Sequence, residues 1–223
     1  MTMPPLTVDI WSDVVCPWCY IGKRRFEAAL EGFEHRDDVT VLWHSFELDP
    51  EAPPVAEGRS AERLAEKYGM SVEEAAARQA EITTLAAQDG LAYDLAESRG
   101  GNTFDAHRLI HLAAEHGLGD AAMERLMSAY FSEREPIGDR DTLQRLAVEV
   151  GLPAGEVREV LDGERYADAV RADERAATQI GIRGVPFFVL GRKYGVSGAQ
   201  PAEVLLQALQ QAWDEVAGPP VSA

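Results

Sequence analysis

The chain opens with two stretches in which apolar and polar residues alternate, and a stretch of helical periodicity lies between them. Residues 6–11 and 39–46 have the period of two that is typical of β-strands with one buried face. Over residues 17–33, apolar side chains recur at helical spacing and charged side chains fall between them. The start of the chain therefore predicts a strand, a helix and a second strand.

Prolines and a glycine then mark a loop, and the pattern from Ser60 to Gly181 is helical. Ser71 and Glu74 have the spacing of a capping box, which predicts the start of a helix. Several of the helical stretches end at glycines, namely Gly90, Gly117 and Gly151. We therefore expect a helical bundle in the middle of the chain.

Strand character returns near the end of the sequence. Residues 187–190 form a continuous apolar run that suits a buried strand, and Gly191-Arg192 can turn it into a hairpin partner over 193–197. Pro201 suits the start of a last helix. The order of elements predicts an α/β protein with a thioredoxin-like fold, in which a helical domain is inserted between the second strand and the second core helix.

Size, composition and charge limit the class of protein. The 223 residues, 46% hydrophobic and 26% charged, suit one large globular domain or a domain with an insertion. We expect residues 1–52 and 165–223 to form the thioredoxin-like domain and residues 53–164 to form the inserted helical domain. The net charge of -17 opposes binding to nucleic acid or anionic lipid. The sequence shows neither a leader peptide nor a membrane-spanning apolar run, and we expect a cytoplasmic protein.

Cys16 and Cys19 are the only cysteines, and random placement would give their spacing in roughly 1% of cases. Pro17 suits the first helical position, which places Cys16 at a helix N-terminus. Unpaired N–H groups and the positive end of the helix dipole favour a thiolate there, and the thiolate is the attacking species in disulfide exchange. Cys19 lies one turn further on and can resolve a mixed disulfide. In a reducing compartment, such a pair indicates catalysis or regulation.

The neighbours of the cysteines allow more than one interpretation. A Cys-x-x-Cys pair can be half of a zinc site, with His107 and His111 as further ligands, but a Pro-Trp insert favours a helix start, and we predict no metal. Trp18 either faces solvent and stacks on a substrate or packs in the core. Asp13 is a candidate proton relay, although acidic residues near turns are common and a carboxylate disfavours a nearby thiolate.

Further motifs accompany the cysteines. Residues 16–19 (CPWC), 183–189 (RGVPFFV) and 193–200 (KYGVSGAQ) together resemble the DsbA family of thiol-disulfide oxidoreductases. Residues 12–22, with Ser-Asp before the cysteines and Tyr-Ile-Gly after them, and residues 102–109 resemble the FrnE-like branch of that family. The resemblance covers nearly the whole chain.

The resemblance implies that Cys16 is the nucleophile, Cys19 the resolving thiol and Pro186 a cis-proline that faces them. An ordinary trans proline at the start of a strand is the alternative for Pro186. Thioredoxin-like proteins often carry a buried carboxylate six positions before the first cysteine, where this chain has Ile10.

Substrate contacts are implied by the same resemblance. The backbone at Val185 is expected to face an extended substrate peptide, and Trp18, Asn102 and His107 are the further expected substrate-binding residues. For His107, a packed histidine in a capped helix is an equally good interpretation.

As a function, the sequence predicts a cytoplasmic enzyme that exchanges the Cys16–Cys19 pair with disulfides or thiols of proteins or small molecules. No cofactor is expected beyond the redox-active disulfide, and glutathione is a candidate co-substrate. One alternative is a glutathione-dependent transferase or isomerase of the kappa-like relatives, including 2-hydroxychromene-2-carboxylate isomerases, which typically present a serine or a single nucleophile at the position of Cys16. A non-catalytic binding module is another. The direction of the reaction, the substrate and the oligomeric state, monomer or homodimer, are left open.

Overall fold

Two strands near the start of the chain and two near its end form a four-stranded mixed sheet. The computed structural model describes residues 6–217. The prediction about a leader peptide concerns the first residues of the chain, and residues 1–5 lie outside the described part. The strands are β1 (Leu6–Ser12), β2 (Val39–Ser45), β3 (Phe187–Leu190) and β4 (Tyr194–Ser197), in the order β2-β1-β3-β4. β1 runs parallel to β2 and antiparallel to β3, which pairs with β4 as a hairpin.

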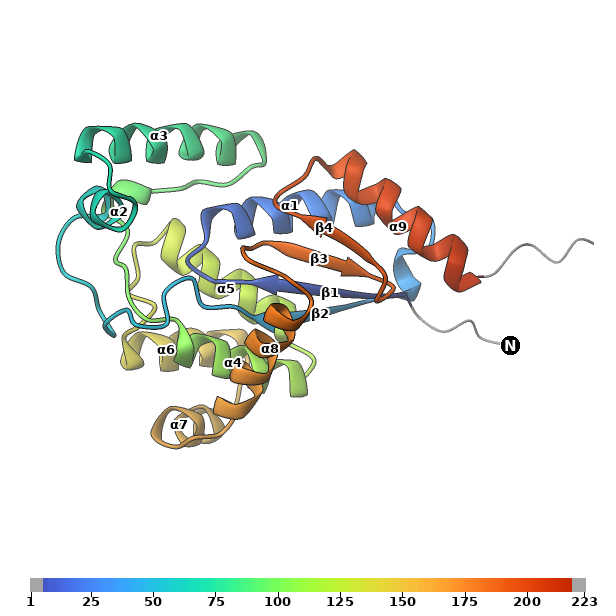
Figure 1. Cartoon of the computed structure of the whole chain (residues 1–223). Coiled ribbons are helices and arrows are strands. Elements are labelled where there is room, and N and C mark those ends of the chain that lie inside the picture. Colours follow the sequence, from blue (N-terminus) through green and yellow to red (C-terminus); the bar gives the residue numbers. More distant parts are fainter. Residues whose placement is uncertain (1–5, 218–223) are drawn as a thin grey trace, which may run out of the picture.

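Helices cover both faces of this sheet. On one face, α1 (Pro17–Glu31) packs beside α9 (Ala202–Ala217), as Figure 1 shows. The core between these helices and the sheet is formed by apolar side chains from every layer, among them Phe26, Phe188, Leu205, Leu209 and Trp213. On the other face, α8 (Ala167–Gln179) packs against β2. This layering holds the start of α1 at the end of β1.

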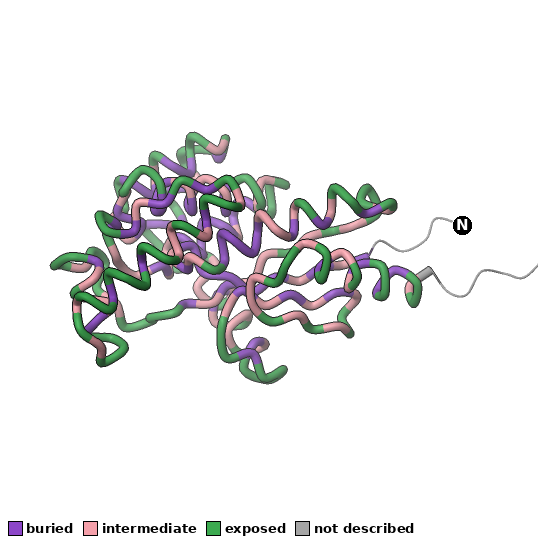
Figure 2. The backbone as a smooth tube through the Cα atoms, turned by 90° about the horizontal axis from the view of Figure 1, so that it is seen from above, coloured by how far each residue is buried: buried purple, intermediate pink, exposed green. Residues whose placement is uncertain are grey.

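Six helices lie between β2 and α8 in the chain. They are α2 (Ser60–Tyr68), α3 (Val72–Gln88), α4 (Phe104–Glu115), α5 (Gly119–Phe131), α6 (Arg140–Val150) and α7 (Ala154–Asp162). Two short 3₁₀ helices, Arg36–Asp38 and Leu95–Glu97, complete the elements of residues 6–217. Buried and exposed residues alternate along these helices, as the purple and green positions in Figure 2 show. Their apolar core is continuous with Cys16, Cys19 and Tyr20, so the helical insertion packs directly on the cysteine segment.

The expected α/β architecture is confirmed, and local details follow from the residues that the sequence indicated. Ser71 and Glu74 form the expected capping box: the Ser71 hydroxyl accepts a hydrogen bond from the Glu74 N–H, and the Glu74 carboxylate accepts one from the Ser71 N–H. The division into domains at residues 53 and 164 stays a prediction. Within the described part of the chain, no helix combines the length and the apolar character needed to cross a membrane.

Candidate active site

Cys16 caps the N-terminus of α1, with Pro17 in the first helical position. The Cys16 carbonyl accepts hydrogen bonds from the N–H groups of Cys19 at 3.0 Å and Tyr20 at 3.4 Å. The Cys16 N–H donates to the Asp13 carbonyl at 3.1 Å, which fixes the turn between β1 and α1. The first turn of α1 contains no acidic residue, so the positive end of its dipole acts on Cys16 uncompensated. Cys16 therefore lies at the helix N-terminus, where the sequence places it.

The loop before β3 closes over the Cys16 sulfur. The Val185–Pro186 peptide bond is cis. The Cys16 thiol donates a hydrogen bond to the Val185 carbonyl across 3.6 Å. The Cys16 side chain is buried, with 4% of its surface exposed. Cys16, Val185 and Pro186 therefore come together, although nearly 170 positions separate the first two in the sequence.

Cys19 is held in a different environment from Cys16. Its side chain is 1% exposed, and burial raises the pKa of its thiol well above the ordinary value, with a further increase from Cys16. Hydrogen bonds from the Asp13 backbone and the Ser12 hydroxyl act in the opposite direction. Cys19 therefore keeps its proton at neutral pH, and this proton must be removed before Cys19 can attack a disulfide.

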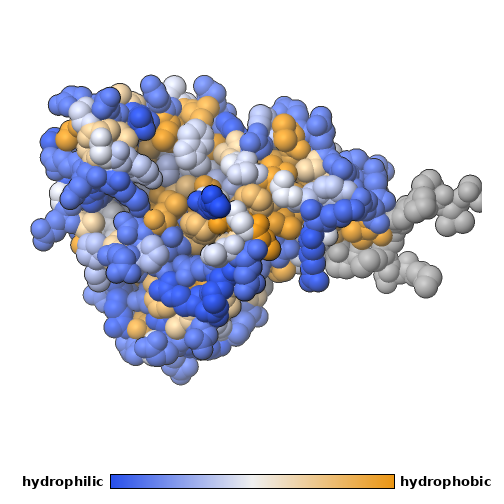
Figure 3. Space-filling model, viewed as in Figure 1, coloured by the Kyte–Doolittle hydropathy of each residue, from blue (hydrophilic) through white to orange (hydrophobic). Residues whose placement is uncertain are grey.

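Trp18 has 41% of its surface exposed, so its ring faces solvent and not the core. Val185 is half-buried beside the cysteines. Figure 3 shows apolar surface gathered near the start of α1 and the neighbouring end of the β3–β4 hairpin, surrounded by hydrophilic surface. Contacts of Trp18 and Val185 with a substrate stay a prediction, and the exposed apolar surface is where such contacts can form.

The structure corrects the prediction that His107 binds substrate. His107 lies on α4 with 1% of its surface exposed, so a substrate cannot reach it. Its Nε2 atom lies 3.4 Å from Oδ1 of Asp13, which is equally buried. The periodicity of α4 places His107 on the buried face of that helix.

Asn102 joins two backbone segments. Its amide nitrogen donates to Glu47 Oε1 at 3.3 Å and to the Pro50 carbonyl at 3.1 Å, and its oxygen accepts from the Phe104 N–H at 2.9 Å. Asn102 thus ties the loop after β2 to the start of α4. Its role in substrate binding stays a prediction.

One residue near the cysteines carried no signal in the sequence. The Tyr93 hydroxyl donates a hydrogen bond to the Pro17 carbonyl at 2.7 Å, and its ring stacks on Phe131 with ring centroids 4.5 Å apart. Burial raises the pKa of Tyr93, and the charges of Cys16 and Cys19 raise it further. Tyr93 lies in an irregular segment of the insertion, where periodicity gives no information about long-range contacts.

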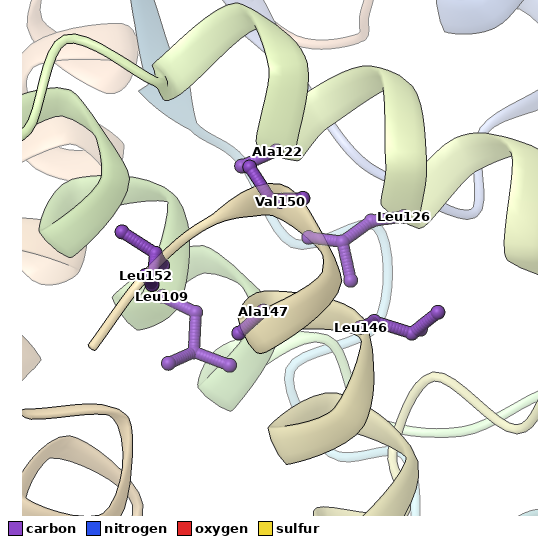
Figure 4. A pocket seen from close by; sticks show the side chains of 7 residues that line it. All are labelled: Leu109, Ala122, Leu126, Leu146, Ala147, Val150 and Leu152. Atoms are coloured by element: carbon purple, nitrogen blue, oxygen red, sulfur yellow. The ribbon is translucent and has the colours of Figure 1, made fainter. Parts of the chain in front are cut away.

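The residues considered for a zinc site are not brought together as ligands. His107 faces Asp13, whereas His111 Nε2 lies 3.2 Å from Asp173 Oδ2 on α8. Within residues 6–217, no three His, Cys, Asp or Glu side chains are grouped as metal ligands. Figure 4 shows a small pocket among α4, α5 and α6, lined only by the aliphatic side chains of Leu109, Ala122, Leu126, Leu146, Ala147, Val150 and Leu152. It offers no polar group to a ligand, so the cysteine segment is the candidate site.

The chain is similar to known proteins in sequence and in structure. A probable DsbA oxidoreductase from Streptomyces coelicolor is 50% identical and has a TM-score of 0.90, with 98% of this chain and 93% of that chain covered. The uncharacterized protein YwbO of Bacillus subtilis is 29% identical over 214 residues, which are 91% of this chain and 94% of the relative.

More distant structures share the fold. The cytosolic disulfide reductase DsbM of Pseudomonas aeruginosa has a TM-score of 0.62 at 19% identity, covering 92% of this chain and 98% of that chain. A 2-hydroxychromene-2-carboxylate isomerase has a TM-score of 0.69 at 14% identity, covering 97% of this chain and 100% of that chain. Residues 7–210 match the family model of the DSBA-like thioredoxin domain, and the chain therefore belongs to the DsbA-like thioredoxin family.

Proposed function

We propose that this protein is a thiol-disulfide oxidoreductase that exchanges the Cys16–Cys19 pair with disulfides or thiols of proteins or small molecules. The observation that carries the proposal is the position of Cys16, at the N-terminus of α1 and 3.6 Å from the Val185 carbonyl. Cys19, one helical turn behind and buried, supplies the second thiol. Membership of the DsbA-like family supports the same reaction.

The exchange proceeds in two displacements. The Cys16 thiolate attacks one sulfur of a substrate disulfide, which breaks the substrate S–S bond, forms a mixed disulfide and releases the other substrate sulfur as a thiolate. Deprotonated Cys19 then attacks the Cys16 sulfur, forms the Cys16–Cys19 disulfide and releases the second substrate thiolate. The substrate gains two electrons and the enzyme loses two. The reverse sequence oxidises a dithiol.

Trp18 and the Val185 backbone are the proposed substrate contacts. The exposed indole of Trp18 provides an apolar face beside Cys16, and a substrate strand can replace the Cys16 thiol as a partner of the Val185 carbonyl. No cofactor is needed, because the cysteine pair carries both electrons. Glutathione is the proposed small-molecule co-substrate, and DsbM of Pseudomonas aeruginosa has been solved with it.

We place the protein in the cytoplasm, where a reducing environment keeps a lone cysteine pair available for exchange. The net charge of -17 supports partners that are neither nucleic acid nor anionic membrane. Isothermal titration calorimetry with glutathione, on reduced and oxidised protein, tests the co-substrate. Absence of binding and of turnover with glutathione disulfide would restrict the substrates to proteins or other thiols.

The decisive experiment compares Cys16→Ser and Cys19→Ser with the unchanged protein in the reduction of insulin and glutathione disulfide. Cys16→Ser is expected to abolish turnover of both. Cys19→Ser is expected to stop at the mixed disulfide, detected by mass spectrometry as substrate covalently bound to Cys16. Full activity of Cys16→Ser would overturn the proposed function.

A further inference from the structure

Four buried side-chain atoms in residues 6–217 lack a hydrogen-bond partner, and two of them, Asp13 Oδ1 and His107 Nε2, face one another at 3.4 Å. A buried polar atom without a partner destabilises the fold, so two such atoms facing each other call for an explanation. Asp13 lies in the turn that leads into the cysteine helix, where its carbonyl accepts the Cys16 N–H, and this position points to a chemical role.

The carboxylate of Asp13 is fixed from one side only. Its Oδ2 atom accepts a hydrogen bond from the Leu48 N–H at 2.8 Å, which leaves Oδ1 with free lone pairs. Oδ1 faces Nε2 of His107 at 3.4 Å, and both side chains are 1% exposed. Asp13 and His107 therefore form a buried pair, away from bulk water.

Cys19 lies next to the residues that carry this pair: the Asp13 backbone and the Ser12 side chain both act on its thiol and lower its pKa, against the larger effect of burial. With 1% of its surface exposed, Cys19 cannot release its proton directly to solvent.

We propose that Asp13 and His107 are the proton acceptor for Cys19 in the second displacement. This inference rests on the proposed exchange reaction and adds a partner from the helical insertion to it. The Cys19 S–H bond breaks and its proton passes to the Asp13–His107 pair, while the Cys19 sulfur bonds to the Cys16 sulfur. The Cys16–substrate S–S bond breaks, and its electron pair leaves with the substrate thiolate, which takes a proton from water. In the oxidising direction the pair returns the proton to Cys19.

Other titratable groups face this pair and belong in its pH dependence. The buried Glu47 lies near His107: burial raises the pKa of Glu47, and Arg171 and His107 act against that increase. Tyr130 lies on the Asp13 side, and the Asp13 charge adds to the effect of burial in raising its pKa. Cys16 faces Cys19. The titratable groups around the Asp13–His107 pair are therefore the Glu47–Arg171 ion pair, the Tyr130 phenol and the two thiols.

The test separates the two displacements with one equivalent of 5,5′-dithiobis(2-nitrobenzoate), whose thionitrobenzoate product is coloured. The first equivalent of colour reports attack by Cys16, and the second reports attack by Cys19. In Asp13→Asn and His107→Asn the first phase is expected to stay within about twofold, and the second to slow by about a hundredfold, as for loss of general-base assistance. The second phase should also lose its pH plateau and rise with hydroxide concentration.

His111→Asn is the matched control, because His111 lies on the same helix and faces Asp173 instead. It is expected to change neither phase. Thermal unfolding of every variant verifies folding, and Asp13→Asn, close to isosteric, supplies the test if His107→Asn does not fold. An unchanged second phase in Asp13→Asn overturns the proton-acceptor role, whereas a missing first phase in the unchanged protein overturns the exchange function itself.

Discussion

Gly22 on α1 lies directly against the ring of Pro186. A Cβ atom at Gly22 would come within 2.8 Å of Pro186 Cγ, closer than carbon atoms normally approach. The absence of a side chain at Gly22 thus allows the loop before β3 to sit on α1. Pro186 follows Val185, whose carbonyl accepts the hydrogen bond of the Cys16 thiol, so the contact lies one residue from the reactive sulfur's partner.

Gly22→Ala is expected to lower activity without the stability gain that alanine usually brings to a helix. Alanine favours a helix by about 1 kcal/mol over glycine, but here the methyl group displaces Pro186 and with it Val185. We expect insulin reduction to fall about tenfold and thermal stability not to rise. Gly155→Ala, in open space on α7, is the control and should keep full activity. Full activity of Gly22→Ala would show that the contact has no influence on Cys16.

Trp18→Ala is expected to separate protein substrates from small ones. The exposed indole is available to a bound peptide, and loss of such an aromatic contact costs about 1–2 kcal/mol. The kcat/KM for insulin should therefore fall roughly tenfold, while the reaction of Cys16 with a small aromatic disulfide changes little. Tyr68→Ala, an exposed aromatic on α2, is the control. Equal losses for both substrates would mean that Trp18 supports Cys16 and does not bind peptide.

His44 links stability to pH through two carboxylates. Its Nδ1 lies 2.8 Å from Asp173 and its Nε2 lies 2.8 Å from Asp9. Burial lowers the pKa of His44, but the bonds to Asp173 and Asp9 outweigh it, and the pKa is raised. The stabilisation is therefore complete below the unfolded value of about 6.5 and is lost as pH rises through the folded pKa.

His44→Gln should remove this dependence. We expect the free energy of unfolding of the unchanged protein to fall by on the order of 1 kcal/mol more than that of the variant between pH 6 and pH 9. Urea titrations at several pH values measure both. Parallel curves for the two proteins would contradict the prediction.

Lys23 joins α1 to α5 through a buried ammonium group. The side chain is 2% exposed and pairs with Glu27, with Asp120 at 3.2 Å and with Glu124 at 3.1 Å. Arg24 also pairs with Glu27 and Glu124, so two of the three carboxylates keep a cation when Lys23 is replaced. Lys23→Met should therefore lower the free energy of unfolding by about 2 kcal/mol, less than the loss of a fully buried pair.

The matched control for Lys23 is an exposed ion pair. Arg59 pairs with Glu62 at 2.7 Å, but its side chain is 77% exposed, so Arg59→Met should lower the free energy of unfolding by much less than Lys23→Met. Urea unfolding compares the two variants. Equal losses would mean that burial does not strengthen the Lys23 pairs.

Local patterns were sufficient for the elements and for the chemistry of the cysteines. Alternation and helical periodicity predicted the strands and the helical middle, and Pro17 predicted that Cys16 would cap α1. These features depend on neighbours within about one helical turn or one strand. A sequence carries such information directly, because backbone propensities and side-chain spacing act over a few residues.

The surroundings of the two thiols were decided by tertiary packing. His107 was expected at the substrate surface and is instead buried against Asp13, and no sequence pattern indicates the contact of Tyr93 with Pro17. Both come from the helical insertion and contact the cysteine segment from more than 70 positions away. Periodicity shows that a helix face is buried, but not which element buries it. The sequence by itself determined where the reactive pair lies, and only the packing of the insertion on α1 determined which groups can take the proton from Cys19.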